Sequence, residues 1–384
     1  MSKIILLGYS GFPFSKSAAS EKQKLIAKAI ILNPSIDVEI LNYISFSNFK
    51  YKRKGLFDGV SYRLMSIYSK YPKNNILRLI NLGYGYLNEF LYVTFRHYDY
   101  IIISSRNSFY IFGHILISKL RSKTVTLTMV EDYDSLNNSS SRISKIKRKI
   151  YFKYVLKYID GVFPISKLIK EEVIKVNKNL PFLELPIFTN FENFNETIAV
   201  DESNYFLFCG AANYFDTIKF IIDSYLVSSL ESSLILVING NKKAISRVSV
   251  YLKNINSKNT IILKSSLSYK VLVGYYKNAN ALLIPLNPDV KDMARFPHKI
   301  AEYCASKRPI ISSNFGEVKK FFEHKENALL LEEHDIYEMN SLMQYVVQNP
   351  EISNKIGLES YQLGYVKFNY KNYGNDIINF LKNI

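Results

Sequence analysis

Short runs of apolar, often β-branched residues alternate along the chain with longer segments in which apolar residues recur every three or four positions. Near-continuous apolar runs of this length are typical of parallel strands that helices cover on both faces. Their alternation with helical segments predicts βαβ units and doubly wound sheets. The expected strands are residues 4–9, 37–41, 100–104, 124–130, 161–165, 205–209, 234–239, 260–263, 281–285, 309–312 and 328–331.

The series of strands restarts near residue 204, after a polar stretch, 191–204, in which the periodicity is lost. We therefore expect two Rossmann-like domains, over residues 1–190 and 204–367, joined by a linker. A last helix, 368–384, is expected to pack back onto the first domain. Two facing domains of this kind are predicted to direct the carboxyl ends of their sheets toward a central cleft. Ligands of open α/β sheets bind outside those ends, so this cleft is the expected binding site.

The chain has 384 residues, of which 48% are hydrophobic, and this suffices for two cores. Its two cysteines, Cys209 and Cys304, exclude a disulfide framework and predict buried thiols in a reducing compartment. The apolar run 4–7 is interpreted as a strand and not as a signal peptide. No apolar run reaches about 18 residues, so we expect no transmembrane helix and a cytoplasmic location.

The formal net charge is +17, and most of the excess lies in residues 1–200. Basic clusters at 50–54 and 142–157 are interleaved with Tyr and Phe. Such a basic half suits an anionic membrane surface or nucleic acid as a partner. The alternative interpretation is that the cations lie on solvated helix faces. No known nucleic-acid-binding module is present, so nucleic acid is not expected. Peripheral attachment to the inner leaflet remains an expectation beside the solvated-face interpretation.

The strongest local signal lies at residues 295–311, which read RFPHKIAEYCASKRPII. Pro297 suits a first helical turn, and Lys299 and Glu302 are three apart on one helix face. Lys299 near a helix start can neutralise a diphosphate, because the unpaired N–H groups there also attract anions. A carboxylate one turn further can accept both hydroxyls of a ribose. A Lys–Glu pair on a helix surface is the alternative interpretation.

This block resembles the donor-site motif of retaining GT-B glycosyltransferases of family 4, in particular the bacterial surface-polysaccharide branch with its Phe-Pro-x-Lys-x-x-Glu-Tyr pattern. The resemblance implies that Glu302 holds the nucleotide ribose. Residues 312–318 match the strand and loop that follow in the family. Ala294 stands where many members carry a Glu that contacts the sugar, and Arg295 or Asp292 could supply that contact instead.

Further segments follow the family's order. Residues 206–212, with Gly210, resemble the first strand and glycine turn of a donor domain, and residues 236–241, with Gly240, resemble the second. Lys219 is the basic residue available after the first turn. The resemblance therefore implies that Gly210, Lys219, Gly240, Arg295, Lys299 and Glu302 bind the donor. A solvated helix residue is the alternative for Lys219.

The first half carries weaker signals. Residues 8–15 resemble the family's glycine-containing first loop, which implies that Gly11 approaches the donor. They do not form a G-x-G-x-x-G fingerprint, so no dinucleotide cofactor is expected.

A predicted strand ends in the acids of residues 131–134. The resemblance makes Glu131 and Asp132 the catalytic candidates, and helix capping is the alternative. Asp132 and Asp134 form an Asp-x-Asp pair, but the histidines show no ligand spacing, and no metal or other cofactor is expected.

The resemblance implies a hexosyltransferase that moves a sugar, with retention, from a nucleotide-sugar donor to a glycan or lipid-linked acceptor in surface polysaccharide synthesis. A non-catalytic GT-B scaffold subunit is the first alternative, since Ala294 lacks the acid, although Lys299 and Glu302 argue against it. A basic nucleic-acid-binding protein is the second.

Overall fold

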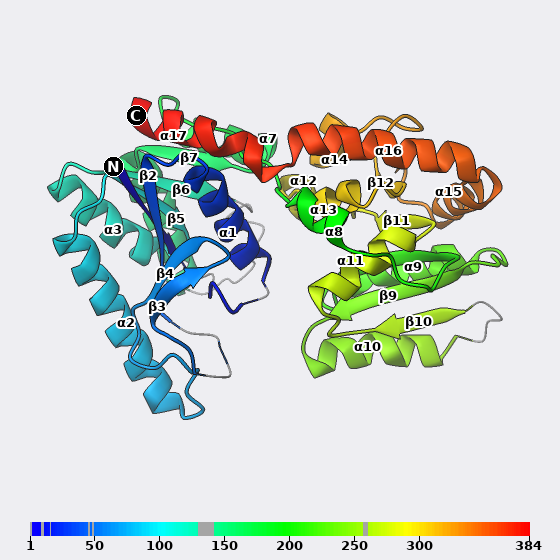
Figure 1. The fold of residues 1–384 in the computed structure, drawn as a ribbon, viewed down its shortest axis with the longest axis horizontal. Helices are drawn as coiled ribbons and strands as arrows, with labels where there is room; N and C mark the ends of the chain where they lie inside the picture. The colour runs from blue at the N-terminus through cyan, green and yellow to red at the C-terminus, as the bar shows by residue number, and fades with distance from the viewer. Residues whose placement is uncertain are drawn as a thin grey trace. The chain divides into compact units, whose positions relative to one another are not determined.

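The computed structural model describes residues 2–8, 11–15, 17–44, 47, 50–129, 142–255 and 260–384. The chain divides into two compact units (Figure 1). The first comprises Met1–Phe188 with Tyr370–Ile384, and the second comprises Thr189–Asn369.

The first unit contains, in its described residues, a sheet of seven strands in the order β3-β4-β2-β1-β5-β6-β7. All neighbours are parallel except β3 and β4. That hairpin was not predicted, and it turns at Asp58 and Gly59, whose φ angles of 50° and 77° suit a type I′ turn. The strands are β1 (Ser2–Gly8), β2 (Ile36–Asn42), β3 (Lys54–Phe57), β4 (Val60–Leu64), β5 (Tyr100–Ser104), β6 (Thr124–Met129) and β7 (Gly161–Pro164).

The C-terminal helix α17 (Gly374–Asn383) belongs to the first unit and packs on α1 (Ala18–Ile31). A Cβ at Gly374 would lie 2.1 Å from the carbonyl oxygen of Ala29, so a glycine is required at this contact. Other helical segments of this unit are α2 (Asn75–Phe95), α3 (Ser108–Leu120), α5 (Arg142–Ile150), π-helical η1 (Tyr151–Val155), α6 (Leu156–Tyr158), α7 (Lys167–Val176) and 3-10-helical η2 (Tyr370–Tyr373).

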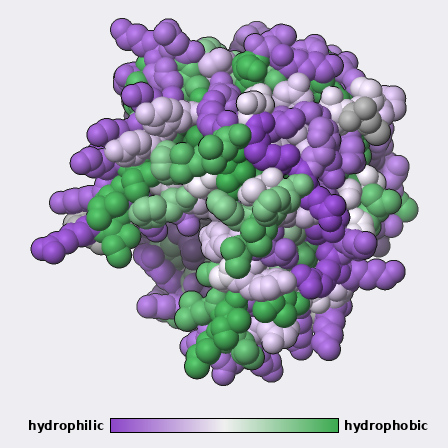
Figure 2. Space-filling model, turned by 90° about the vertical axis from the view of Figure 1, so that its left-hand side faces the viewer, coloured by the Kyte–Doolittle hydropathy of each residue, from purple (hydrophilic) through white to green (hydrophobic). Residues whose placement is uncertain are grey.

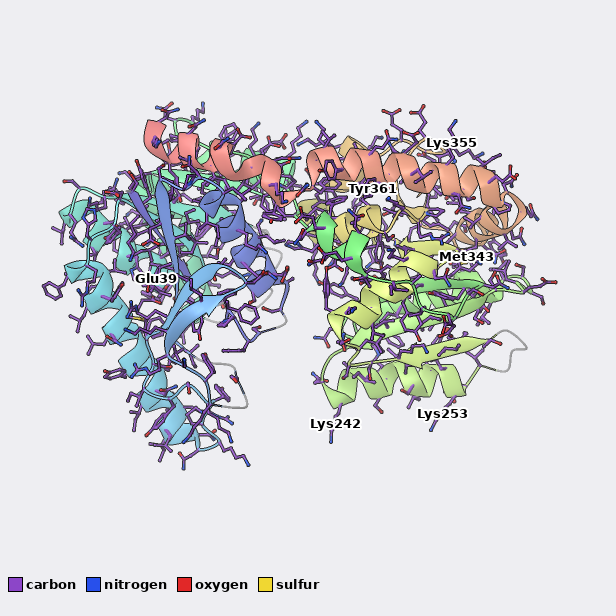
Figure 3. The ribbon with its side chains drawn as sticks, viewed as in Figure 1. Glu39, Lys242, Lys253, Met343, Lys355 and Tyr361 are labelled. Atoms are coloured by element: carbon purple, nitrogen blue, oxygen red, sulfur yellow. The ribbon has the colours of Figure 1, made fainter. Side chains whose placement is uncertain are left out.

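Glu39 is one of the buried carboxylates of the first unit. Glu39, labelled in Figure 3, is 4% exposed on β2. Its oxygens accept hydrogen bonds from Lys3 Nζ at 3.1 Å, Arg63 Nε at 2.9 Å and Tyr92 Oη at 2.8 Å. Burial alone would raise the pKa of Glu39, but the Tyr92 hydroxyl and the two cations outweigh it, and the pKa lies below its ordinary value.

The second unit contains, in the residues described, six parallel strands in the order β10-β9-β8-β11-β12-β13. The strands are β8 (Tyr205–Ala211), β9 (Ser233–Asn239), β10 (Ile261–Lys264), β11 (Ala281–Ile284), β12 (Ile310–Ser313) and β13 (Leu329–Leu331). The helices are α8 (Phe191–Glu196), α9 (Phe215–Leu226), α10 (Lys242–Lys253), α11 (Tyr269–Asn278), α12 (Val290–Ala294), α13 (Lys299–Ala305), α14 (Gly316–Phe321), α15 (Ile336–Gln348) and α16 (Pro350–Lys367).

The polar stretch expected to be a linker begins instead with helix α8. The side chain of Asn190 caps it by accepting a hydrogen bond from the Glu192 N–H. Phe191 is 1% exposed, and its ring lies 5.5 Å from the rings of both Tyr361 and Tyr365 on α16. Burial of this aromatic residue attaches the segment to the second unit.

Each predicted strand is present, and the predicted α/β class with two Rossmann-like sheets is confirmed. In both sheets the chain reverses its winding direction at a central pair, β1 with β5 and β8 with β11. Gly8 ends β1 with a φ of 133°, and a Cβ there would lie 2.0 Å from the carbonyl oxygen of Ser104 on β5. Ligands of doubly wound sheets bind outside the carboxyl ends at such switch points.

Candidate functional site

Two glycine turns lie side by side at the carboxyl edge of the second sheet. Gly210 is the second-last residue of β8 and pairs with Ile238 of β9, and Gly240 directly follows β9. A Cβ at Gly240 would lie 3.1 Å from the Cβ of Ala212, and the Ala212 N–H donates to the Asn239 carbonyl at 2.8 Å. Gly240 is exposed and has no side chain, so a phosphate could approach the backbone closely at this turn.

Lys299 and Glu302 form an ion pair in the first turn of α13. Nζ of Lys299 lies 2.7 Å from Oε2 of Glu302, and the two side chains are 30% and 13% exposed. Burial lowers the pKa of the Lys299 ammonium, but the Glu302 carboxylate more than compensates and the pKa is raised. Lys299 therefore carries its charge at all physiological pH values.

Aromatic side chains hold this pair against the end of β8. Tyr303 is fully buried on α13, and its hydroxyl accepts a hydrogen bond from the Cys209 N–H at 3.0 Å. The ring of Tyr276 lies edge-on to that of Tyr303, with the two centroids 5.2 Å apart. Nζ of Lys299 lies 5.6 Å from the centroid of the Tyr276 ring. Burial raises the pKa of the Cys209 thiol, so this cysteine is an unreactive part of the packing.

Arg295 joins two loops at the same edge. Its Nε lies 2.6 Å from Oδ1 of Asp292, and its guanidinium carbon lies 4.3 Å from the ring centroid of Tyr214 before α9. Oδ2 of Asp292 accepts a hydrogen bond from the Asn287 N–H at 2.8 Å. Ala294 is 1% exposed. Asp292 and Arg295, the two residues suggested as substitutes for an acid at position 294, are thus paired with each other.

The structure places Lys219 away from this cluster. Its ammonium pairs with Asp223 one turn further along α9 and lies 5.5 Å from the ring centroid of Tyr251 on α10. The hydrogen bond to Asp223 raises the pKa of Lys219. The contacts found for Lys219 among the described residues are therefore to α9 and α10, and not to Lys299 or Glu302.

The candidates of the first half are placed only in part. Gly11 is buried with a φ of 70°, and its carbonyl accepts hydrogen bonds from the N–H groups of Phe14 and Ser15 in a tight turn after β1. Glu131 and Asp132 lie outside the described residues, as does Asp134. In the part of the chain that the structure describes, no three His, Cys, Asp or Glu side chains converge on a common point.

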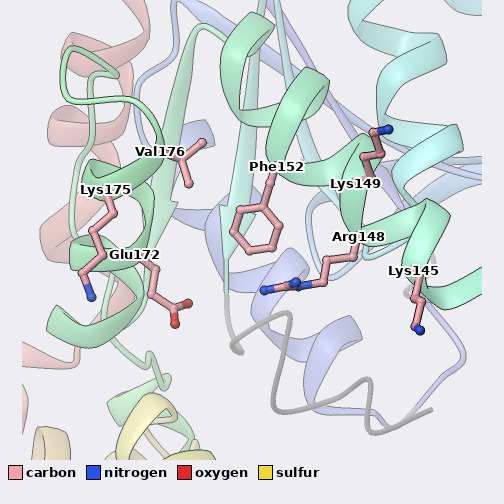
Figure 4. A pocket seen from close by; sticks show the side chains of 7 residues that line it. All are labelled: Lys145, Arg148, Lys149, Phe152, Glu172, Lys175 and Val176. Atoms are coloured by element: carbon pink, nitrogen blue, oxygen red, sulfur yellow. The ribbon is translucent and has the colours of Figure 1, made fainter. Parts of the chain in front are cut away.

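The basic stretch of the first half lines an open cavity between α5 with η1 and α7 (Figure 4). Phe152 projects into it, and Arg148 lies 5.4 Å from the centroid of that ring. The remaining lining residues are Lys145, Lys149, Glu172, Lys175 and Val176. Four cations against one carboxylate favour an anionic occupant, but the cavity is distinct from the Lys299 cluster.

Sequence reasoning missed the residues that position the site. Tyr276, Tyr303 and Cys209 come from α11, α13 and β8 and meet only through the fold. An apolar or aromatic residue inside a helical pattern carries no signal beyond core packing. Asp292 was suggested as a substitute for the missing acid, and its i,i+3 spacing to Arg295 is the signal that could have indicated their pairing.

Comparison with known proteins defines the class. Residues 190–363 match the family model described as Glycosyl transferases group 1. No curated protein matches the chain.

Many solved structures resemble the chain, among them these three. Sucrose-phosphate synthase from Thermosynechococcus elongatus is 14% identical with a TM-score of 0.76, covering 100% of this chain and 99% of that one. Anabaena HepE in complex with UDP and glucose is 12% identical with a TM-score of 0.73 and full coverage of both chains. A glycosyltransferase from Rickettsia africae is 13% identical with a TM-score of 0.73, covering 100% and 98%.

Residues 190–363 of the second unit thus match a group 1 glycosyltransferase domain, and the whole chain has the GT-B fold. The prediction of a glycosyltransferase is confirmed at this level. Assignment to family 4 and to its surface-polysaccharide branch stays a prediction. No described helix is both long enough and apolar enough to cross a membrane.

Proposed function

We propose that this glycosyltransferase moves a hexose from a nucleoside diphosphate sugar to a glycan or lipid-linked acceptor in surface polysaccharide synthesis, with retention of the anomeric configuration. The observation that carries the proposal is the partly buried Lys299–Glu302 pair, held by Tyr303 at the end of β8 next to the glycine turns. This edge of a doubly wound sheet is where nucleotides bind.

Glu302 is the residue proposed to recognise the ribose. Its Oε2 is held by Lys299, while Oε1 accepts no hydrogen bond from the described residues. A ribose offers two neighbouring hydroxyl donors. Oε1 can accept a hydrogen bond from one of them, and Oε2 can accept one from the other while it also accepts from Lys299. Hydrogen bonds to a charged group of this kind contribute about 1.5–3 kcal/mol.

The leaving diphosphate requires positive charge at the same edge. Lys299 is charged and only 30% exposed, and Arg295 is 17% exposed beside Tyr214. With the backbone N–H groups near Gly210 and Gly240, they would stabilise the charge that develops as the glycosidic bond breaks. Lys219 would have to leave Asp223 to contribute. Arg295 is also the side chain proposed to contact the sugar in place of an acid at position 294.

UDP sugars are the donors to test first. The structurally similar Anabaena protein HepE was solved with UDP and glucose. The likeness is one of fold at 12% identity, so the base and the sugar have to be measured.

Calorimetric titration of UDP, GDP and their glucose conjugates into the full chain tests the proposal. Wild type is expected to bind one nucleotide series, and Glu302→Ala to bind it about 10–150-fold more weakly. Glu21→Ala is the matched control, because it breaks another i,i+3 Lys–Glu helix pair, with Lys24 at 2.9 Å. Equal affinity of wild type and Glu302→Ala would refute the assignment of the ribose site.

The scaffold hypothesis makes the opposite prediction, namely that none of these nucleotides binds. If a donor is found, the anomeric proton coupling of the product by NMR decides between retention and inversion. A lipid-linked acceptor would also bring the protein to the inner leaflet, where each engaged Lys or Arg contributes about 1 kcal/mol. Release by high salt is the expected behaviour for that electrostatic part.

A further inference from the structure

Helix α2 buries polar side chains and exposes apolar ones, which is the reverse of the usual pattern for a helix of a globular unit. The residues that face the interior include Asn81 and Glu89, both 0% exposed. Its outward face is almost entirely apolar, and these side chains are 41–77% exposed. They are Ile76, Leu77, Leu79, Ile80, Tyr84, Leu87, Phe90, Leu91 and Phe95. We call these nine residues the α2 face.

Polar contacts fix this orientation. The Asn81 side chain accepts a hydrogen bond from the Tyr68 N–H at 2.9 Å, and Glu89 accepts one from the Tyr110 hydroxyl at 2.5 Å. A Cβ at Gly85 would lie 1.8 Å from the carbonyl oxygen of Tyr43, so the helix closely approaches the backbone that follows β2. Rolling the α2 face inward would therefore leave buried polar groups without partners, which is unfavourable.

The neighbouring helix α3 extends the apolar surface. Phe109, Leu116 and Leu120 are 54%, 50% and 87% exposed at helical spacing. Gly113 between them lies against Phe90 of α2, whose ring is 3.8 Å from the ideal Cβ position. Figure 2 looks onto the side of the molecule where α2 and α3 lie in Figure 1, and it shows hydrophobic side chains gathered in contiguous patches. An apolar surface of this extent marks an interaction site.

The charges around the α2 face are positive. Lys73 and Arg78 lie at the start of α2 and Arg96 at its end, where Arg121 of α3 donates to the Arg96 carbonyl at 2.6 Å. Glu89, which is buried, is the single acid in residues 70–98 of the sequence, and the next one, Asp99, is paired with Lys123 at 3.4 Å. Beyond α3, helix α5 reads RISKIKRKI and exposes Ile143 and Ile146 among its cations.

From this arrangement we propose that the α2 face, with the stripe on α3, inserts into the interface of an anionic lipid bilayer while the surrounding cations contact lipid phosphates. Apolar and aromatic side chains flanked by Lys and Arg are the composition of interfacial helices. A second copy of the chain fits less well. Both ends of α2 are cationic and its acid is buried, so parallel and antiparallel pairing each bring like charges together.

The inference goes beyond the donor site and does not depend on it. It adds an apolar contribution to the electrostatic attraction expected of the basic stretches. High salt should therefore weaken vesicle binding without abolishing it, whereas purely electrostatic binding would be lost.

The sequence contains no Trp, so one introduced Trp reports its own surroundings. Leu87→Trp places it on the α2 face, where the side chain is 58% exposed. Leu358→Trp on α16, at 48% exposure, is the matched control. Vesicles of phosphatidylcholine with about one-third phosphatidylglycerol should shift the emission of Leu87→Trp to the blue and leave that of Leu358→Trp unchanged. A shift in neither or in both overturns the proposal.

Vesicle flotation gives an independent test. The variant Leu79→Ser/Leu87→Ser/Phe95→Ser should lose vesicle binding at least ~10-fold, since each change removes exposed apolar area. The control Ile352→Ser/Leu358→Ser/Val366→Ser on α16, at 49%, 48% and 61% exposure, should bind like wild type. Circular dichroism and nucleotide titration confirm that each variant is folded. Equal binding by both variants refutes the proposal, as does a wild-type dimer that the α2 variant abolishes.

Discussion

The backbone N–H of Cys209 donates a hydrogen bond to the hydroxyl of Tyr303, 3.0 Å away. Strand β11 pairs with β8 only as far as Phe208, so Cys209 is the first residue past that pairing. The hydroxyl on α13 takes the place of a strand partner, and it ties the helix that carries Lys299 and Glu302 to the end of β8. Its removal is therefore expected to disturb both stability and the site.

Tyr303→Phe leaves the Cys209 N–H buried without an acceptor. The free energy of unfolding should fall by about 1–3 kcal/mol, and nucleotide affinity should fall with it because α13 loses its attachment. Urea denaturation and calorimetry measure the two effects. Tyr337→Phe, at a position 65% exposed on α15, is the control and should change neither. Equal stability of the two variants would contradict the role assigned to the hydroxyl.

The Arg295–Asp292 pair should couple strongly, because Asp292 is 2% and Arg295 17% exposed. Asp292→Ala should destabilise the protein by about 3 kcal/mol, since a buried cation loses its partner. A double-mutant cycle with Arg295→Met measures the coupling. The exposed pair Lys167–Glu171, 3.9 Å apart, is the comparison and should couple by less than about 0.5 kcal/mol. Similar coupling free energies in the two cycles would contradict the prediction that burial strengthens the Arg295–Asp292 pair.

Lys22 gives the protein a pH dependence in the neutral to alkaline range. It is 4% exposed on α1, Nζ has no hydrogen-bond partner among the described residues, and burial lowers its pKa to about 7. Between pH 7 and 10.5 the unfolded chain binds more protons at this site than the folded chain, so this residue makes stability rise with pH over that range.

Lys22→Met should consequently stabilise the protein at pH 7 by on the order of a few kcal/mol, at about 1.4 kcal/mol per unit of pKa difference. The gain should shrink toward pH 10, where Lys22 is neutral in the folded chain and the unfolded chain is losing its proton. Urea denaturation at pH 7 and 9.5 tests this. Lys28→Met on the same helix removes a pair with Asp58 at 2.9 Å and should give no such gain. A gain from Lys22→Met that is equal at both pH values would disprove the explanation.

Two glycines inside helices should respond oppositely to alanine. A Cβ at Gly364 on α16 would lie 2.5 Å from the Cβ of Cys304 on α13, so Gly364→Ala should destabilise by about 1–3 kcal/mol. Gly83 on α2 is exposed, and an added Cβ would meet nothing within 4 Å. Gly83→Ala should stabilise by about 0.5–1 kcal/mol through helix propensity. Thermal unfolding compares them, and shifts of the same sign would contradict the packing argument.

The strands could be predicted because a parallel strand covered on both faces must be apolar along its whole length. Runs such as those of β8 and β11 therefore stand out in the sequence. The β3–β4 hairpin was missed, since a solvated edge hairpin has no such run. Asp58-Gly59 was the available signal, as this dipeptide favours a type I′ turn. Its neighbours 50–54 were interpreted as a basic cluster alone.

The pairing of Lys299 with Glu302 followed from their spacing, because residues three apart on a helix are neighbours. For Lys219, the order of segments along the chain led to a different expectation from the contact that the structure shows. The family order placed it near the donor, but an acid one turn away, Asp223, takes its ammonium in the structure. Spacing along a chain identifies partners on the same helix and says nothing about partners on other elements.

By itself, the sequence determined the order of the buried parallel strands, the restart of the second sheet and the composition of the donor motif, because these depend on local periodicity and on residue type. Tertiary structure alone decided that Tyr303 binds the Cys209 backbone and that α2 turns its apolar side outward. A helical pattern shows that a helix has two unlike faces. Which of them is buried depends on the groups that meet it, here Tyr68 and Tyr110, and these lie outside the helix, in the segment before it and on α3.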